Sequence, residues 1–319
     1  MVTVIQKQAP VSENDNGKRL DQVAAHLFDE FSRARLQIWI KSGELTVNGN
    51  TARPRDKVFQ DDLLVLDAAV EEESRWEAVP MDLTVIFEDD DLLVINKPAG
   101  LVVHPAAGHI NDTLLNALLH HCPDLANIPR AGIVHRLDKD TSGLLVIAKT
   151  LVAHANLVEQ LHDRTVKREY EAITYDVMTG GGKVDMPLGR HPTQRKKMAV
   201  VEDGKEAITH YRVIKRYPAH THVAVKLETG RTHQIRVHMA QIRYPLVGDP
   251  VYGGRLRMPP NAPEILRENL RLFNRQALHA RRLGLIHPAT GEHIEWECDL
   301  PQDMQNLLAA LTEHLSYAD

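Results

Sequence analysis

Apolar positions near the start of the chain predict a small module of two helices and a tight turn. Those at the spacing of one helix face are Leu20, Val23, Ala24 and Leu27, and those of a second helix are Leu36, Trp39 and Ile40. Ser32 is a good N-cap for the second helix, and Gly43 is a good C-terminal stop. Asn48-Gly49 then favours a hairpin turn within a strand. We therefore expect a compact module over 17–66, preceded by a flexible lead-in over 1–16.

After residue 82 the pattern predicts a second, larger domain, and the acidic stretch 67–82 is typical of a linker. The segment LTVIFEDDDLLVINKP indicates two strands joined by an acidic turn. Helices are expected over about 112–121, opened by Asn111 or Asp112, and over about 151–163. The residues expected to face inward on the latter helix are Leu151, Ala155, Val158 and Leu161. From 167 onward strands dominate, so 83–319 should be an α+β domain with a mixed, largely antiparallel sheet.

Composition places the chain among ordinary globular proteins of about two domains. It has 319 residues, 43% hydrophobic and 25% charged. It contains no apolar run of about 18 residues, and its first residues lack the pattern of a signal peptide. Cys122 and Cys298 lie far apart, which fits a reducing compartment. We expect a cytoplasmic protein with no membrane association.

The net charge of −5 is unevenly distributed. Residues 61–91 contain twelve acidic side chains and one basic one, so this segment carries −11 and the rest of the chain +6. Binding of a polyanion depends on local basic surface and not on the total charge. On charge alone, however, solvated lysines and arginines explain the excess more simply.

Basic residues gather on and after the second helix of the N-terminal module. They are Arg33, Arg35 and Lys41, followed in the next loop by Arg53, Arg55 and Lys57. The stretches RLDQVAAHL and SRARLQIWIKSGELTVNG, with this basic loop, resemble an S4 RNA-binding domain. The resemblance implies that Arg33 and Lys41 contact RNA. A helical hairpin with a solvated basic face is the alternative.

Common cofactor and metal motifs are absent from the chain. There is no GxxxxGK[ST], no GxGxxG after a strand, no HExxH and no GxSxG. His233 and His238 are five residues apart, whereas two histidines that share a helix face would be four apart. We therefore expect neither a metal nor a cofactor.

Two charged stretches could carry chemistry together. HRLDKDTSG (135–143) holds Asp138 and Asp140 in a turn that runs into an apolar strand, and taken alone it is most simply a solvated turn. In ETGRTHQIRVH (228–238), Arg231 follows a glycine that breaks a strand, and Thr232 could cap a helix. An arginine at such a junction can pair with a carboxylate and favour its charged form. Asp138 with Arg231 would make a nucleophile or base that needs no metal.

Five stretches, in order, resemble the pseudouridine synthase family of the ribosomal large-subunit type. They are NKPAGLVVHP, HRLDKDTSGLLVIAK, KREYEAI, ETGRTHQIRVHMAQIRYPLVGDPVYG and QALHARRLGLIHP. With the S4-like module they cover nearly all of the chain after residue 16. The resemblance implies the pseudouridine synthase fold, with Asp138 as the catalytic aspartate, Tyr170 as the active-site tyrosine and Arg231 as the partner of Asp138. It also implies that Leu278 lines the pocket and that His135 and Arg136 help to bind substrate.

The implied reaction breaks the N1–C1′ bond of uridine, turns the base and forms a C5–C1′ bond. Nothing is oxidised, which agrees with the absence of a cofactor motif. A carboxylate could attack C1′ or remove a proton from C2′, and the sequence does not choose between these routes. Tyr170 would stack on the uracil. The alternative role for Tyr170 is that of an aromatic residue of a strand, packed in the core.

The family resemblance implies that large-subunit ribosomal RNA is the partner, at stem-loop uridines and within pre-ribosomal particles or free of them. The segment 189–200 carries Arg190 and Lys196 and could grip phosphates, or be an ordinary solvated loop. We expect a monomer. The alternatives are a synthase acting on transfer RNA, a non-catalytic RNA-binding assembly factor, and a nucleosidase or glycoside hydrolase. The last would need a second acid suitably far from Asp138, and Asp140 is poorly placed for that role.

Overall fold

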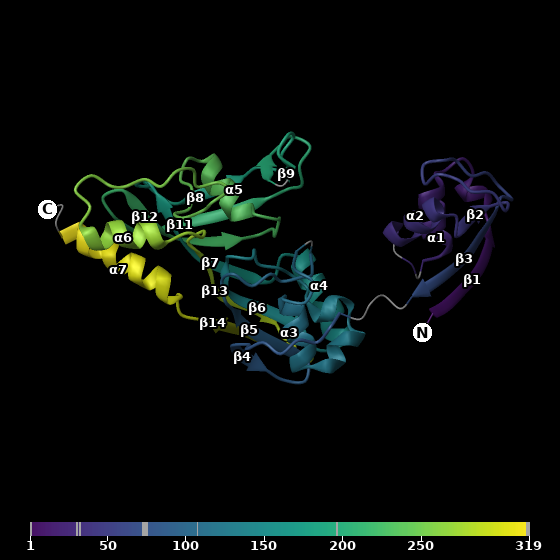
Figure 1. The fold of residues 1–319 in the computed structure, drawn as a ribbon, viewed down its shortest axis with the longest axis horizontal. Helices are drawn as coiled ribbons and strands as arrows, with labels where there is room; N and C mark the ends of the chain where they lie inside the picture. The colour runs from purple at the N-terminus through teal and green to yellow at the C-terminus, as the bar shows by residue number, and fades with distance from the viewer. Residues whose placement is uncertain are drawn as a thin grey trace. The chain divides into compact units, whose positions relative to one another are not determined.

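A computed structural model gives the fold and describes residues 2–29, 31, 33–71, 76–106, 108–195 and 197–316. The chain divides into two compact units, Met1–Arg75 and Trp76–Asp319. Each unit has its own hydrophobic core. The helices and most strands of both units are labelled in Figure 1.

The first unit packs two helices against a small antiparallel sheet. Its elements are β1 (Val2–Pro10), a 3-10 turn (Glu13–Asp15), α1 (Leu20–Leu27), α2 (Arg33–Ser42), β2 (Leu45–Val47) and β3 (Leu63–Glu71). The strand order is β1-β3-β2. Leu36, Trp39 and Ile40 of α2 are buried, as the pattern predicts. Ser32, the expected cap of α2, lies outside the described residues.

Two boundary predictions in this unit are wrong. The expected flexible lead-in contains β1, which pairs with β3 along its whole length because Ile5 and Ala9 pack on the core. The expected linker begins too early, since β3 continues to Glu71. The turn prediction is confirmed: Asn48 and Gly49 both have positive φ, and Val47 and Asn50 exchange backbone hydrogen bonds.

A nine-stranded sheet organises the second unit. Its strands are β4 (Val85–Glu88), β5 (Leu92–Lys97), β6 (Ser142–Ala148), β7 (Lys167–Tyr175), β8 (Gly182–Asp185), β11 (Ile208–Arg216), β12 (His220–Leu227), β13 (Leu278–Ile286) and β14 (His293–Glu297). The order is β4-β5-β6-β13-β7-β12-β11-β8, and β14 pairs with β13. The β6–β13 pair is parallel, whereas the other strand pairs of this sheet are antiparallel. This confirms the predicted α+β class.

Helices cover both faces of this sheet because its central strands are apolar on both sides. Leu145 and Ile147 of β6 join the cluster that includes α3 (Leu114–His121) and α5 (Gln234–Gln241). Leu144 and Val146 join the cluster that includes α4 (Leu151–His162) on the other face. The neighbouring helices α6 (Glu264–Leu272) and α7 (Gln302–Ser316) share a third cluster with the end of β7 (Figure 1).

Some helix predictions need correction. In α4 the inward face carries Ala153 and Leu157, whereas Leu151 is 61% exposed. Thr150 caps this helix and accepts a hydrogen bond from the Ala153 amide. The helix that begins there turns a different face to the core from the one that the apolar pattern predicted. At the start of α5, His233 and not Thr232 occupies the cap position, with a left-handed backbone (φ 57°). Similarly, Thr113 and not Asn111 or Asp112 precedes α3.

The segment 189–200 is a β-hairpin and not a simple loop. Strands β9 (Leu188–Arg190) and β10 (Met198–Val200) pair antiparallel, with Met198 opposite Arg190. Residues 191–197 connect the two strands.

One glycine lets the HRLD loop meet the centre of the sheet. Gly143 has φ of 115°, and a Cβ there would lie 2.3 Å from the backbone oxygen of Ala280. Only glycine permits this approach of β6 to β13. The loop that carries Asp138 is thereby fixed beside β13 and β7.

Candidate active site

A cavity of about 680 Å³ opens between the HRLD loop, β7, the segment 230–233 and α5. Its lining includes Asp138, Arg168, Tyr170, Arg231, Arg236 and Leu278. The structure thus brings together the main catalytic candidates from stretches far apart in the sequence. Asp140, in the turn after Asp138, is not among the lining residues.

Asp138 is held by an arginine that is itself clamped by a second carboxylate. Arg236 Nη1 donates a hydrogen bond to Asp138 Oδ2 at 3.0 Å. Its Nε and Nη2 donate to the two oxygens of Asp249 at 2.7 and 2.9 Å. Asp249 is fully buried and the Asp138 side chain is 16% exposed. This two-sided pairing fixes the Asp138 carboxylate in the cavity.

Burial lowers the pKa of Arg236, but its hydrogen bonds and its attraction to Asp249 and Asp138 outweigh this and raise the pKa above the usual value for arginine. The cation is therefore permanent. Burial raises the pKa of Asp249, but the hydrogen bonds and the charge of Arg236 outweigh this effect. The pKa of Asp249 is therefore below its usual value.

The predicted pairing of Asp138 with Arg231 is wrong. Arg231 lines the same cavity, but its Nε donates to the backbone oxygen of Glu206 at 2.9 Å. Helix α5 is buried on nearly all sides, so Arg236 lies inside together with Ile235 and Met239.

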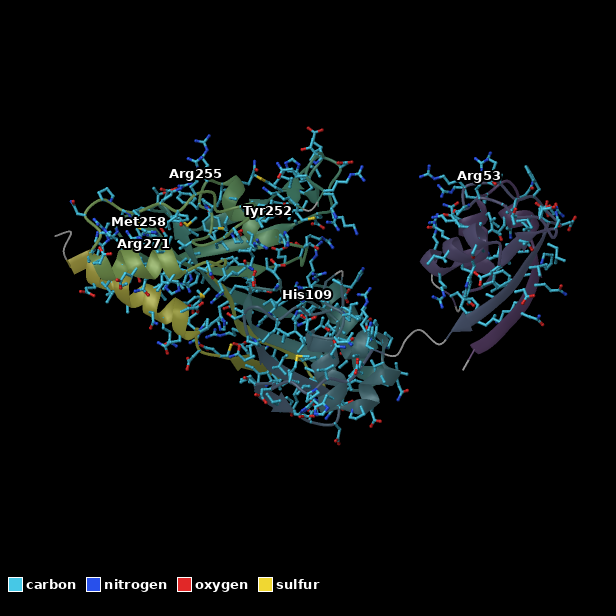
Figure 2. All side chains as sticks on the ribbon, in the orientation of Figure 1. Arg53, His109, Tyr252, Arg255, Met258 and Arg271 are labelled. Carbon is cyan, nitrogen blue, oxygen red and sulfur yellow. The ribbon has the colours of Figure 1, made fainter. Side chains whose placement is uncertain are left out.

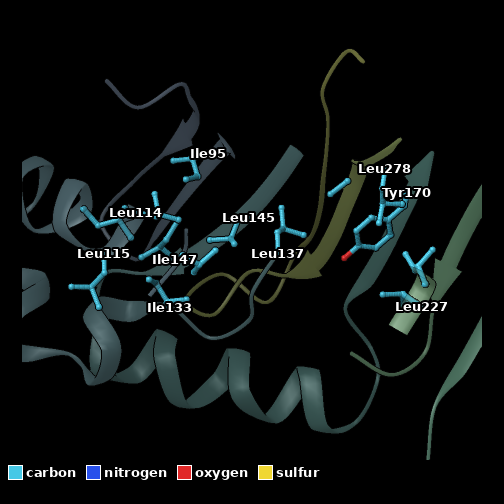
Figure 3. Close-up of a cluster of buried hydrophobic side chains, with 14 of the residues drawn as sticks. Ile95, Leu114, Leu115, Ile133, Leu137, Leu145, Ile147, Tyr170, Leu227 and Leu278 are labelled. Atoms are coloured by element: carbon cyan, nitrogen blue, oxygen red, sulfur yellow. The ribbon is translucent and has the colours of Figure 1, made fainter. Parts of the chain in front are cut away.

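An apolar wall faces the carboxylate. Tyr170 on β7 and Leu278 on β13 are buried and lie together with Leu227 at one end of the main core cluster, opposite Leu137 (Figure 3). Burial raises the pKa of Tyr170, and Asp138 raises it as well, while Arg168 lowers it. The phenol is therefore protonated at neutral pH and presents a neutral ring to the cavity.

A buried lysine ties the HRLD loop to the end of β5. Lys97 Nζ donates to the backbone oxygens of Pro98, Leu101 and Lys139 at 2.7, 2.9 and 3.0 Å. Burial lowers the pKa of Lys97 to about 7, while the nearby carboxylates Asp140 and Asp138 raise it. Three acceptors need all three protons of the ammonium, so we take Lys97 to be charged at neutral pH.

His135 and Arg136 both line the cavity, but in different ways. His135 Nε2 accepts a hydrogen bond from the Val146 amide, and burial lowers the pKa of His135 to about 3. A neutral, inward-held imidazole is a support for the loop. Arg136 is exposed at the cavity and can meet an anionic ligand.

A chain of contacts runs from the site to the hairpin. His233 Nε2 lies 3.9 Å from Asp138 Oδ1, and its Nδ1 lies 2.8 Å from the hydroxyl of Tyr252. That hydroxyl accepts a hydrogen bond from the Met198 amide of β10 at 2.9 Å. Tyr252, labelled in Figure 2, also lies under the guanidinium of Arg236. The hairpin is thus attached to the residues around Asp138.

The remaining candidates for RNA contact lie outside this cavity. Arg190 is exposed in a second hollow with Arg195, and Lys196 lies outside the described residues. In the first unit, Lys41 is exposed on α2.

Arg33 has an internal partner. Its Nη2 donates to the buried Asp21 at 2.8 Å, alongside Arg19 and Gln37. Burial raises the pKa of Asp21, but these hydrogen bonds lower it to about 2. The pairing gives Arg33 a structural role between α1 and α2.

Several site residues were not found by sequence reasoning. Arg236, Asp249, Lys97 and Arg168 all lie within quoted motifs, but nothing in their spacing showed which side chains turn inward. Within the described residues, no group of three or more histidine, cysteine, aspartate or glutamate side chains is placed to hold a metal ion. In the same part of the chain, no helix is long and apolar enough to cross a membrane.

Comparisons with known proteins decide the family. Residues 91–241 match the family of RNA pseudouridylate synthases. Over 313 residues the chain is 60% identical to ribosomal large subunit pseudouridine synthase D of Pseudomonas aeruginosa, covering 98% of each chain. The chain belongs to the RNA pseudouridylate synthase family. It is also 51% identical to the protein of the same name from Escherichia coli strain K12, covering 98% of this chain and 96% of that relative.

Solved structures agree with this membership. Human RNA pseudouridylate synthase domain containing 4 matches with a TM-score of 0.57 and 29% identity, covering 72% of this chain and 93% of that one. The human domain-containing 1 protein, at 24% identity and a TM-score of 0.55, supports the fold, covering 76% of this chain and 90% of that one. The resemblance found in the sequence is confirmed, and the protein is an RNA pseudouridine synthase.

Proposed function

We propose that this synthase acts in the cytoplasm, as a monomer, on uridines of large-subunit ribosomal RNA, either free or in pre-ribosomal particles. The substrate class is supported by the names of the relatives that match 98% of the chain. The observation that carries the catalytic assignment is the Asp138 carboxylate, paired with Arg236 inside a cavity walled by Tyr170.

In this proposal Asp138 is the group that initiates the reaction. Its charged form can attack C1′ or take a proton from C2′, and both routes release the uracil from the sugar. The carboxylate is only 16% exposed, so few water molecules can compete with the substrate for it. No electrons are gained or lost overall, so the reaction needs no redox cofactor.

Tyr170 and Leu278 are proposed to hold the uracil ring. The target nucleotide must leave its stack to reach them, and this costs a few kcal/mol, less in a loop than in a helix. A flat aromatic ring and an apolar side chain replace the lost stacking. They also allow the ring to turn, because neither anchors it by hydrogen bonds.

Basic surfaces outside the cavity are proposed to hold the RNA backbone, together with Arg136 at its rim. In the second unit the hairpin offers the exposed Arg190, and Lys196, outside the described residues, is proposed to act with it. In the first unit the S4-like module offers Lys41 and the exposed Arg53, Arg55 and Lys57. Such contacts position RNA through its phosphates and do not read the sequence.

The test is tritium release from C5-labelled uridine in large-subunit ribosomal RNA. Wild type and Asp138→Asn are compared with no metal or nucleotide added, and binding of the same RNA is measured alongside. We expect release by wild type only, with RNA affinity within about threefold for the two proteins, because the variant keeps the shape of the side chain and loses its charge.

A parallel reaction on transfer RNA separates the substrate alternatives. Release from transfer RNA alone would overturn the ribosomal substrate and keep the role of Asp138. Equal release by wild type and Asp138→Asn would overturn that role.

A further inference from the structure

Arg168, in the KREY stretch, is a buried arginine that the reaction as described does not use. It lies on β7 two residues before Tyr170, so both side chains point to the same face of the sheet. It is 7% exposed and lines the same cavity as Asp138 and Tyr170. The two side chains are also close enough for the Arg168 charge to act on the Tyr170 phenol, whose pKa it lowers.

The charge of Arg168 is uncompensated in the described part of the chain. No carboxylate there lies within ion-pair distance of its guanidinium, and its Nε is buried without a hydrogen-bond partner. One hydrogen bond is present, from Nη2 to the backbone oxygen of Glu228 at 3.3 Å. Burial lowers the pKa of Arg168, Tyr170 raises it and the neighbouring Arg231 lowers it further. A buried cation without a counter-ion is unfavourable unless a ligand supplies one.

The backbone beside Arg168 is shaped to admit its guanidinium. A Cβ on Gly230 would lie 2.6 Å from Arg168 Nη1, so a larger residue would push the guanidinium aside. The Arg168 guanidinium therefore packs directly against the backbone of Gly230 at the cavity.

We propose that Arg168 is a further catalytic residue that stabilises the negative charge of the uracil ring when its bond to the sugar breaks. This inference rests on the proposed function. When the N1–C1′ bond breaks, its electron pair leaves with the uracil, and the charge spreads over N1, O2 and O4. The sugar is balanced by a new bond from Asp138 to C1′ or by transfer of the C2′ proton to Asp138. An N–H of Arg168 donates to the ring oxygen that gains charge. C5 then bonds to C1′ as the Asp138–C1′ bond breaks, or as Asp138 returns its proton to C2′, so Asp138 is again a carboxylate. The C5 proton passes to solvent and N1 takes one up, so the ring is neutral in the product.

The ring is a better match for Arg168 than a phosphate is. A phosphate is fully charged before the reaction and is met by exposed arginines such as Arg136 and Arg190. Arg168 is buried beside Tyr170, where the base lies. A donor aimed at charge that develops only in the transition state accelerates the reaction, whereas one that binds ground-state charge improves affinity.

The experiment varies the leaving group. Large-subunit ribosomal RNA is transcribed with uridine or with 5-fluorouridine, whose fluorine makes N1 more acidic and the ring a better leaving group. Single-turnover formation of the rearranged C-nucleoside is measured by mass spectrometry after nuclease digestion, and RNA affinity is measured separately. Arg168→Met should lower the rate on uridine about 100-fold, with RNA affinity within about threefold of wild type. On 5-fluorouridine we expect its deficit to shrink to about tenfold, because less charge needs stabilisation.

Matched variants separate the charge of Arg168 from its position and from a general effect of removing an arginine. Arg168→Lys keeps the charge and should recover part of the rate. Gly230→Ala keeps the arginine but displaces it, so it should give a smaller, leaving-group-dependent loss. Arg282→Met removes an arginine of the adjacent strand β13 that pairs with Glu297 and does not line the cavity, and it should match wild type on both RNAs.

Two results would overturn the inference. One is an equal deficit of Arg168→Met on uridine and 5-fluorouridine. The other is a tenfold or greater loss of RNA affinity with an unchanged single-turnover rate, which would indicate a phosphate contact. If Arg168→Met does not fold, the Lys and Gly230→Ala variants give the same comparison. Wild type that forms no product on this RNA would overturn the proposed function, and this inference with it.

Discussion

Arg236 contacts two carboxylates at once, and its planar guanidinium is the feature that makes this possible. Arg236→Lys should reduce kcat about 100-fold and leave RNA affinity within about threefold. A single ammonium cannot donate two parallel bonds to Asp249 and also reach Asp138, so the Asp138 carboxylate loses its position. Single-turnover kinetics and a filter-binding assay on the same RNA measure the two quantities.

The control for this substitution is Arg257→Lys, because Arg257 pairs with Asp176 on the surface. It should retain wild-type kinetics. If Arg236→Lys weakens binding as much as turnover, then Arg236 contacts RNA and is not a positioning residue for Asp138.

At the same scale, the sequence predicted residues that meet at the cavity but not every partner. The HRLD motif pointed to Asp138 and KREY to Tyr170, because each residue lies in a long and specific stretch, and both line the cavity. The partner of Asp138 was placed five residues too early, at Arg231. Arg231 and Arg236 are both arginines of one motif, and the direction of a side chain depends on how α5 is buried. That burial comes from elements distant in sequence, so local periodicity does not show it.

At the scale of elements, the packing of α7 against the sheet makes stability depend on pH. His220 of β12 is 1% exposed and neither ring nitrogen has a partner among the described residues. Burial lowers its pKa from the usual 6.5 to about 4, Asp176 raises it, and His314 of α7 lowers it. Between these pH values the unfolded chain binds the proton more tightly, so stability falls as pH decreases from about 6.5 to about 4. The loss from this residue is on the order of 3 kcal/mol.

His220→Phe should remove this dependence, because phenylalanine fills a similar volume beside Tyr175 and does not titrate. The pH slope of the unfolding free energy of the second unit should become shallower by up to about 1.4 kcal/mol per pH unit below pH 6. Calorimetric unfolding at about pH 7.5, 6 and 5 measures the slope. His162→Gln, at a histidine side chain that is 87% exposed, should keep the wild-type slope. An unchanged slope in His220→Phe would show that other groups carry the acid sensitivity.

Predictions of helices and strands succeeded where the pattern of apolar residues allowed only one way of packing the element on the core. β5 and β6 contain continuous apolar runs, and in α2 Leu36, Trp39 and Ile40 define one buried face. Predictions failed where residues could satisfy more than one packing. α4 has enough apolar residues for several inward faces, and in β1 only Ile5 and Ala9 of the described side chains pack on the core.

At the scale of the whole molecule, we expect the two units to divide catalysis from part of the RNA binding. Every residue that lines the cavity belongs to Trp76–Asp319. Deleting residues 1–75 should therefore leave the single-turnover rate at saturating RNA within about threefold of wild type. It should weaken RNA affinity about tenfold or more, because the exposed basic residues of the first unit are lost. The boundary after 75 matters, since a cut at 66 would leave part of β3 exposed.

The salt dependence of RNA binding tests directly whether the first unit contacts RNA phosphates. Each phosphate contact to single-stranded RNA contributes about 0.7 to the slope of log affinity against log salt concentration. Replacing Arg53, Arg55 and Lys57 by alanine in the full chain should lower the slope by up to about 2, and the deletion by at least as much. Affinity and slope unchanged by the deletion would mean that the first unit does not bind RNA. A truncated protein that fails to fold would contradict the independence of the two cores.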